Sequence, residues 1–172
     1  LYRPDIDGLR AVAIFVVVLF HAYPKLLPGG FVGVDVFFVI SGFLISTILF
    51  RSLQRGDFDF AEFYVHRVKR IFPALAVVLA VVYGLGWVLL LPDEFAQLGK
   101  HMAAGAGFVQ NFVLWQEAGY FDTASELKPL MHLWSLAIEE QFYLLYPVLI
   151  WGVWRLGLNS LTVLFVLAAV SF

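Results

Sequence analysis

Long apolar runs, separated by short polar stretches, make up most of this sequence. Four runs are predicted to be membrane-spanning helices, over residues 9–23, 31–50, 71–91 and 133–154, and a fifth begins near Leu161. A helix of about 20 apolar residues crosses the ~30 Å of hydrocarbon in a bilayer. Residues 98–115 are amphiphilic, and their pattern leaves open a polar span or a re-entrant segment. We therefore expect an all-α, polytopic bundle of transmembrane helices.

The composition favours the same class. Hydrophobic residues make up 62% of the chain and charged residues 14%, whereas soluble domains contain ~45–50% and ~25%. The absence of cysteine excludes disulfides, thiolate metal sites and a cysteine nucleophile, and we expect neither a metal nor a nucleic-acid partner. The sequence starts at Leu1 without a recognisable signal peptide and stops at Phe172 within an apolar run. Residues 1–172 are therefore interpreted as the N-terminal part of a longer membrane domain.

Positive charges orient the predicted helices in the membrane. The connection between the second and third runs contains five cations: Arg51, Arg55, Arg67, Lys69 and Arg70. The connection over residues 24–30 contains only Lys25. Because cytoplasmic loops are enriched in lysine and arginine, the pattern predicts a multi-pass protein of the plasma (inner) membrane with a cytoplasmic N-terminus.

An arginine and a histidine share the first apolar run. Ten apolar residues separate Arg10 from His21, and eleven steps of ~100° place both side chains within ~20° of one helix face, ~16 Å apart. A charged side chain deep in lipid costs at least ~2.5 kcal/mol and usually faces a cavity or a partner. The pair predicts a polar pocket. The alternative is that Arg10 snorkels to the headgroups while His21 lies at the opposite interface.

A basic block over residues 63–73 precedes the third run. On a helix, His66, Arg67 and Arg70 lie three or four positions apart and cluster on one side, with Lys69 nearby. Such a cluster can bind an anionic phosphate, because arginine supplies forked donors. Anchoring to acidic lipids, at about 1 kcal/mol per cation, is the alternative.

The second run contains a carboxylate among apolar residues and glycines. Asp35 requires a cation or a water-filled site unless it lies in the interface, and Ser41 is a further pocket candidate. Gly33 and Gly42 would allow neighbouring helices to approach closely.

The fourth run carries two adjacent glutamates. His132, Ser135 and Glu139 are spaced to share one helix face, and Glu140 points ~100° away. Two acidic groups within a span favour a functional site, although a helix end along the interface with solvated carboxylates remains the alternative.

These sequence blocks, in this order, resemble the acyltransferase-3 family of integral membrane O-acyltransferases. Within the family, their sequences are most similar to the branch that O-acetylates bacterial O-antigen and peptidoglycan. The similarity covers nearly the whole chain. It lies in residues 2–11, His21, and residues 29–45, 63–73, 109–111, 119–122 and 133–143. The resemblance implies transfer of an acyl group, usually acetyl, from cytoplasmic acetyl-CoA to a carbohydrate hydroxyl on the far side. In proteins of this branch, an extracytoplasmic SGNH-type domain often follows the membrane domain.

The resemblance also implies roles for individual residues. Arg10 and His21 match a signature on which activity is thought to depend, and Arg67 and Arg70 match a motif associated with the acyl donor. The motif departs from the family pattern because His66 replaces the first of two adjacent arginines, and Lys69 is the candidate that compensates.

The chemistry of these side chains fits an acyl transfer. Histidine is the residue type that ordinarily changes charge near neutral pH, which makes His21 the best general-base candidate. The sequence is equally compatible with a histidine that carries the acyl group covalently. Arg10 would hold the donor or stabilise the tetrahedral oxyanion, while Glu139 or Glu140 would orient the imidazole or the sugar. The main alternative function is a proton-coupled transporter, to which intramembrane charged residues are equally suited.

Overall fold

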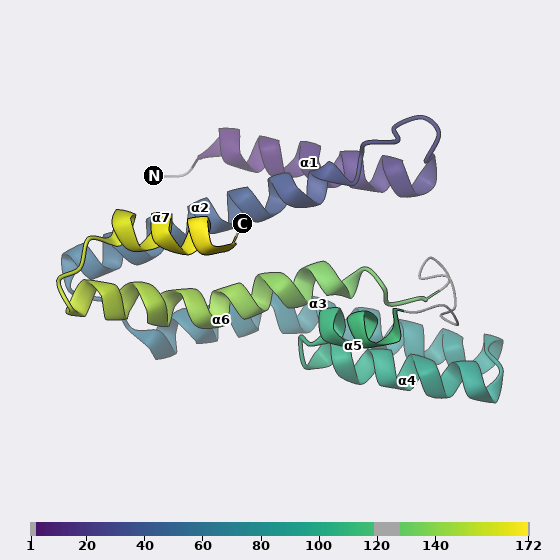
Figure 1. Cartoon of the computed structure of the whole chain (residues 1–172). Coiled ribbons are helices and arrows are strands. Elements are labelled where there is room, and N and C mark those ends of the chain that lie inside the picture. Colours follow the sequence, from purple (N-terminus) through teal and green to yellow (C-terminus); the bar gives the residue numbers. More distant parts are fainter. Residues whose placement is uncertain (1–2, 119–127, 172) are drawn as a thin grey trace. The chain divides into compact units, whose positions relative to one another are not determined.

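A computed structural model of the chain describes residues 3–118 and 128–171, and every regular element within them is a helix (Figure 1). The predicted all-α class is confirmed. The helices are α1 (Pro4–Ala22), α2 (Val32–Arg55), α3 (Phe60–Leu89), α4 (Pro92–Ala106), α5 (Gln110–Glu117), α6 (Leu133–Arg155) and α7 (Ser160–Ser171). Two compact units divide the chain, one over residues 1–58 with α1 and α2, the other over residues 59–172 with α3 to α7. Tyr2 and the block over residues 119–122 lie outside the described residues.

Each apolar run of the sequence is a helix, and α2 and α3 are long and apolar enough to cross a membrane. The other runs stay predictions as spans, because charged residues interrupt α1 and α6 and because α7 is short. Helix α1 begins before the predicted start, at Pro4, where proline suits the first helical position. Helix α2 continues past Phe50 to Arg55 and ends on Gly56, whose φ of 73° provides a left-handed cap.

Helix α3 differs most from its prediction, because it joins the basic block and the apolar run into one helix of 30 residues. At 1.5 Å per residue it is about 45 Å long, more than a bilayer core requires. Its start is set by Asp59, whose carboxylate accepts hydrogen bonds from the backbone N–H groups of Ala61 and Glu62. Pro73 lies inside the helix. The apolar run that begins at Ile71 is therefore the C-terminal part of a longer helix, and the helical spacing expected for the basic block is confirmed.

The amphiphilic residues 98–115 form two helices, so a single continuous helix over these residues is excluded. Helix α4 ends at Ala106, Phe108 has a left-handed φ of 54°, and α5 begins at Gln110. Bulky residues rarely adopt a positive φ, and tertiary contacts hold this one. The ring of Phe108 packs edge-on against Phe72 of α3, and its carbonyl accepts a hydrogen bond of 2.7 Å from Gln141 of α6.

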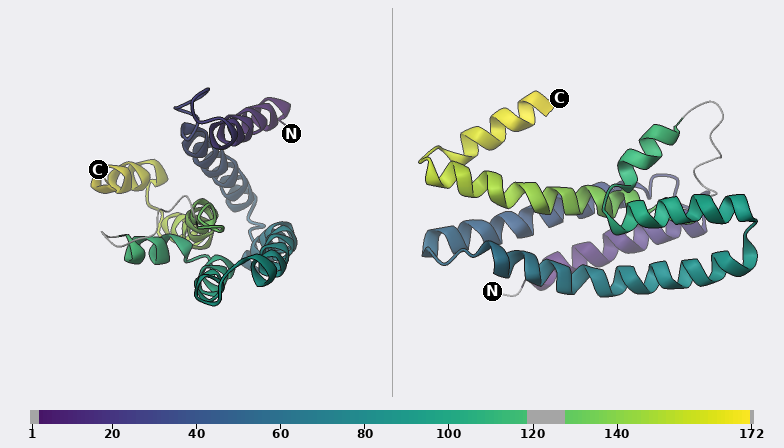
Figure 2. Two further views of the ribbon diagram at one scale, coloured as in Figure 1. Left: turned by 90° about the vertical axis from the view of Figure 1, so that its right-hand side faces the viewer. Right: turned by 90° about the horizontal axis from the view of Figure 1, so that it is seen from below.

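The first unit is a close-packed hairpin of α1 and α2 (Figure 2). A Cβ added at Gly33 would lie 2.5 Å from the carbonyl oxygen of Ala13, and one at Gly30 would lie 2.6 Å from Cβ of Phe20. The predicted role of Gly33 in close helix approach is confirmed. Within the described residues, a Cβ at Gly42 would find no neighbour within 4 Å, so the same prediction is not confirmed there.

In the second unit, side chains connect α3 to α6. The ring of Phe60 packs against Trp151 at 5.7 Å between centroids, and the hydroxyl of Tyr64 donates to the carbonyl of Leu144 at 2.8 Å. Pro147 lies inside α6 and has no N–H, so the helix lacks the donor that would reach the carbonyl of Tyr143, one residue before Leu144.

Candidate functional site

Arg10 packs against the neighbouring helix instead of extending alone along the surface. Its guanidinium carbon lies 5.4 Å from the centroid of the Phe37 ring on α2, and Asp7 approaches it at 3.8 Å. The side chain is 26% exposed. Helix α1 is continuous from Arg10 to His21, so the spacing argument that places both residues on one face applies to the structure.

His21 lies in the last turn of α1 with an exposed side chain. Its Nδ1 is 2.8 Å from the carbonyl oxygen of Val17, one turn earlier. A carbonyl only accepts, so Nδ1 carries the proton, and in the neutral imidazole the lone pair is on Nε2. A histidine in this tautomer has the electronic form that a general base or an acyl acceptor needs.

The structure separates the two polar candidates of α2. Gly33, Phe37 and Ser41 recur at four-residue intervals and form the stripe that faces α1, and Ser41 is buried with 7% exposure. Asp35 lies two positions, or ~200°, from Gly33 and is exposed. Among the described residues no cation forms an ion pair with Asp35. Asp35 therefore points away from the side on which Arg10 packs.

Arg67 is the centre of the candidate site in the second unit. Its side chain is half-buried, and its guanidinium carbon lies 3.9 Å from the centroid of the Tyr143 ring and 5.9 Å from that of Phe63. This contact is a close cation–π interaction, which holds the guanidinium without a hydrogen-bond acceptor. Over the part of the chain that the structure describes, no group accepts a hydrogen bond from Arg67. Its in-plane N–H donors are therefore available to a ligand.

The glutamates of α6 lie beside this arginine. The buried Tyr143 donates its hydroxyl hydrogen to Oε1 of Glu139, one turn earlier on the same helix. Glu140 lies close enough to Arg67 and Arg70 for their charges to interact. Its Oε1 is buried and has no hydrogen-bond partner among the described residues. The structure therefore brings Arg67 together with Glu139, Glu140 and Tyr143, a grouping that the sequence did not predict.

The remaining candidates of this unit lie outside that group. Lys69 and Arg70 are exposed on α3. His132 is the residue before α6, and Ser135 donates its hydroxyl to the His132 carbonyl at 3.1 Å. That bond serves the start of the helix. Ser135 nevertheless lies one helical turn before Glu139, as the spacing predicts.

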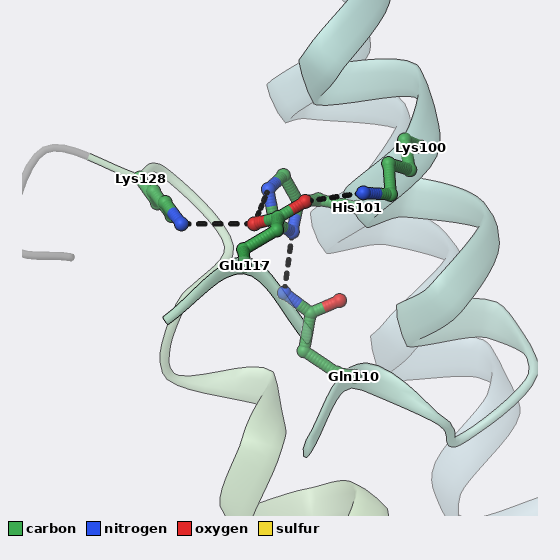
Figure 3. Close-up of polar contacts among 5 residues, drawn as sticks. All are labelled: Lys100, His101, Gln110, Glu117 and Lys128. Atoms are coloured by element: carbon green, nitrogen blue, oxygen red, sulfur yellow. Dashed lines mark hydrogen bonds and ion pairs between the residues drawn. The ribbon is translucent and has the colours of Figure 1, made fainter. Parts of the chain in front are cut away.

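A second polar cluster, which sequence reasoning missed, joins α4, α5 and the segment before α6 (Figure 3). Glu117 forms ion pairs with Lys100 at 2.5 Å, Lys128 at 2.8 Å and His101 at 3.3 Å. Burial alone would raise the pKa of Glu117, but hydrogen bonds from both lysines outweigh it and lower the pKa to about 2. The buried Gln110 bonds to Nδ1 of His101 at 2.9 Å. The polar residues of 98–115 were the signal in the sequence, but their common partner Glu117 was not among them.

A third set of polar contacts ties α5 to α6. Asn111 and Gln141 exchange hydrogen bonds of 2.9 Å and 3.3 Å between their amides, and Gln141 also reaches the Phe108 carbonyl. Because Gln141 directly follows Glu140, these contacts fix the rotation of α6 and with it the direction of both glutamates.

Comparison with known proteins agrees with the resemblance noted in the sequence. A family model described as an acyltransferase domain matches residues 3–172. The O-acetyltransferase OatA of Staphylococcus aureus strain NCTC 8325 is 42% identical over 152 residues, and OatA of strain COL is identical to the same extent. The alignment covers 87% of this chain and 25% of either relative. No solved structure matches the chain significantly.

The family match covers the two units together, including both candidate groups of side chains. With the apolar helices α2 and α3, it identifies a membrane protein. The chain belongs to the acyltransferase-3 family.

Proposed function

We propose that the protein is an integral membrane O-acyltransferase that moves an acyl group, usually acetyl, from acetyl-CoA or another acyl-CoA to a hydroxyl of a cell-surface carbohydrate. The observation that carries the proposal is Arg67, a half-buried arginine held on an aromatic face with its N–H donors available. The printed names of the relatives, O-acetyltransferases, support the reaction type. The chain spans 25% of their length, so the reaction is assigned to the full-length protein.

The acyl donor is bound through its phosphates. Arg67 offers a planar fork of donors that matches two oxygens of one phosphate, and the exposed Lys69 and Arg70 extend the positive surface along α3. The stacking on Tyr143 supports this assignment, because it restricts the guanidinium without using its N–H groups. A proton relay needs no such phosphate-binding group, which favours the transferase over the transporter.

His21 carries the chemistry at the acceptor. In the transfer step the acceptor hydroxyl gives its proton to Nε2 of His21 while its oxygen attacks the thioester carbonyl carbon. Collapse of the tetrahedral intermediate breaks the carbon–sulfur bond, and the departing thiolate takes the proton from the imidazolium. Arg10 holds the acyl donor, because it lies ~16 Å from His21 along α1, too far to reach the carbonyl oxygen at that residue. A transient acetyl-imidazole on the same nitrogen is the alternative route.

The protein lies in the plasma (inner) membrane with several spans and a cytoplasmic N-terminus. Arg51 and Arg55 at the end of α2, together with the cations at the start of α3, support this orientation by the positive-inside rule. The same orientation places the phosphate-binding cations at the face where acetyl-CoA is made.

The acceptor is a carbohydrate of the cell envelope, such as peptidoglycan or lipopolysaccharide, and an SGNH-type domain follows the membrane domain in the full-length protein. These two assignments rest on the resemblance to the acyltransferase-3 family.

Membranes containing the full-length protein test the proposal against the transporter. They are incubated with radiolabelled acetyl-CoA and purified envelope glycans, and a parallel sample carries a pH-sensitive dye in sealed vesicles. Label in an alkali-labile ester on the glycan is the expected result. Solute-dependent proton movement without labelled glycan would replace the transferase by the transporter.

A further inference from the structure

Tyr143 contacts two candidate functional groups that come from different helices. Its ring lies under the guanidinium of Arg67 from α3, 3.9 Å from ring centroid to guanidinium carbon. Its hydroxyl donates a hydrogen bond to the carboxylate of Glu139 on α6. Tyr143 is 4% exposed, so packing restricts the movement of its ring and keeps both contact partners in place.

The two contacts reinforce each other chemically. A phenol whose hydroxyl donates a hydrogen bond to a carboxylate has more electron density in its ring. The negative face of such a ring attracts a cation more strongly. The cation–π contact uses no hydrogen-bond acceptor, and no described group accepts a hydrogen bond from Arg67, so its N–H donors are available to a ligand. The carboxylate of Glu139 is held at the same time by the hydroxyl.

We propose that Tyr143 is a positioning residue that holds the donor-binding Arg67 and the carboxylate of Glu139 in one fixed arrangement. The inference rests on the proposed function, since it assigns Arg67 to the acyl donor. Tyr143 touches neither substrate in this scheme and acts through its two neighbours. Its ring serves donor binding, and its hydroxyl serves the chemical step.

Three variants separate these roles. Tyr143→Phe keeps the ring beneath Arg67 and removes the hydroxyl from Glu139. Tyr143→Leu removes both contacts. Tyr146→Phe is the matched control, because it removes a hydroxyl from a buried tyrosine one turn further along α6. Expression in the membrane and thermal unfolding in detergent report whether each variant folds.

Steady-state kinetics with labelled acetyl-CoA give the expected pattern. Tyr143→Phe lowers kcat by ~10-fold, the scale of a lost hydrogen bond to a charged group, with KM for acetyl-CoA unchanged. Tyr143→Leu also raises that KM by ~5-fold, the scale of a lost cation–π contact. In a Glu139→Gln background, Tyr143→Phe has little further effect, because its target carboxylate is already absent. Tyr146→Phe resembles the wild type.

Each other outcome overturns a specific claim. A Tyr143→Phe enzyme with wild-type kcat would refute the positioning role while the wild-type activity kept the proposed function intact. A Tyr143→Leu enzyme that folds and has an unchanged KM would refute the link to Arg67. A wild-type protein without acetyl transfer would refute the proposed function, and the inference with it.

Discussion

At the scale of single residues, His21 and Arg67 present their functional nitrogens in different ways. His21 uses Nδ1 for the backbone of its own helix, which leaves the lone pair of the neutral ring on Nε2. Arg67 is held by a cation–π contact with Tyr143, and no described group accepts a hydrogen bond from its N–H donors. In both cases a local contact orients the side chain that the proposed chemistry uses.

Replacing Arg67 and Arg70 together by Gln is expected to weaken binding of the acyl donor. Hydrogen bonds to charged groups contribute ~1.5–3 kcal/mol each, so KM for acetyl-CoA should rise ~10-fold or more. Arg51→Gln, which removes an exposed cation from α2, is the control. Titration of acetyl-CoA in the transfer assay measures the change. An unaltered KM combined with less protein in the membrane would favour lipid anchoring.

Replacing Arg10 by Lys separates a ligand-binding arginine from a membrane anchor. Lysine keeps the charge and reaches the interface equally well, but it cannot reproduce the planar fork of donors or the stacking on Phe37. The variant should insert normally and retain little activity, as measured by immunoblotting of membranes and by acetyl transfer. Full activity in Arg10→Lys would identify Arg10 as an anchor and weaken the case for a pocket on α1.

At the scale of helices, the sequence was most informative where apolar runs are long. The start of α6 at Leu133 was predicted correctly, and those of α1 and α2 within a few residues. The cap at Asp59, where α3 begins, was not identified from the sequence, because the predicted run was bounded by its apolar residues alone. The break at Phe108 depends on contacts with α3 and α6, which a local pattern does not contain.

In the candidate site too, the sequence predicted relations within one helix but not contacts between helices. Helical spacing predicted that Arg10 shares a face with His21, because both lie on one helix. It did not identify Tyr143, whose importance comes from Arg67 on another helix. The ion pairs of Glu117 were missed for the same reason, because their lysines come from distant parts of the chain. Residue types and helical spacing predict which side chains share a helix face, and tertiary contacts decide which helix faces meet.

Glu117 is expected to stabilise the α4–α5 hairpin in a pH-dependent way. The pKa of Glu117 is lowered to about 2 in the folded protein, so its stabilising effect is present above the ordinary pKa of a glutamate. The effect is lost as the pH falls from that value towards 2. Glu117→Gln should lower the unfolding temperature at pH 7 and reduce the difference in unfolding temperature between pH 7 and pH 3.

Tryptophan fluorescence during heating in detergent measures both effects. Asp93→Asn is the control, because Asp93 is exposed in the first turn of α4. If Glu117→Gln unfolded at the wild-type temperature at pH 7, the ion pairs with Lys100, His101 and Lys128 would not hold the hairpin.

At the scale of the whole molecule, the proposal combines two units with different tasks. The unit with α1 and α2 supplies His21 and Arg10, and the unit with α3 to α7 supplies Arg67 and the glutamates. The family match extends over both. In the proposal, the base for the acceptor lies in the first unit and the phosphate-binding Arg67 lies in the second.

Acetyl transfer by inside-out membrane vesicles tests this account most directly. The vesicles contain the full-length protein, either wild type or His21→Ala, and radiolabelled acetyl-CoA is added outside, at the face that was cytoplasmic. Val12→Ala, an exposed position on the same helix, controls for changes to α1. The account predicts labelled carbohydrate with the wild type and the control, and none with His21→Ala at equal protein in the membrane. Equal labelling by His21→Ala, or no labelling by the wild type, would contradict it.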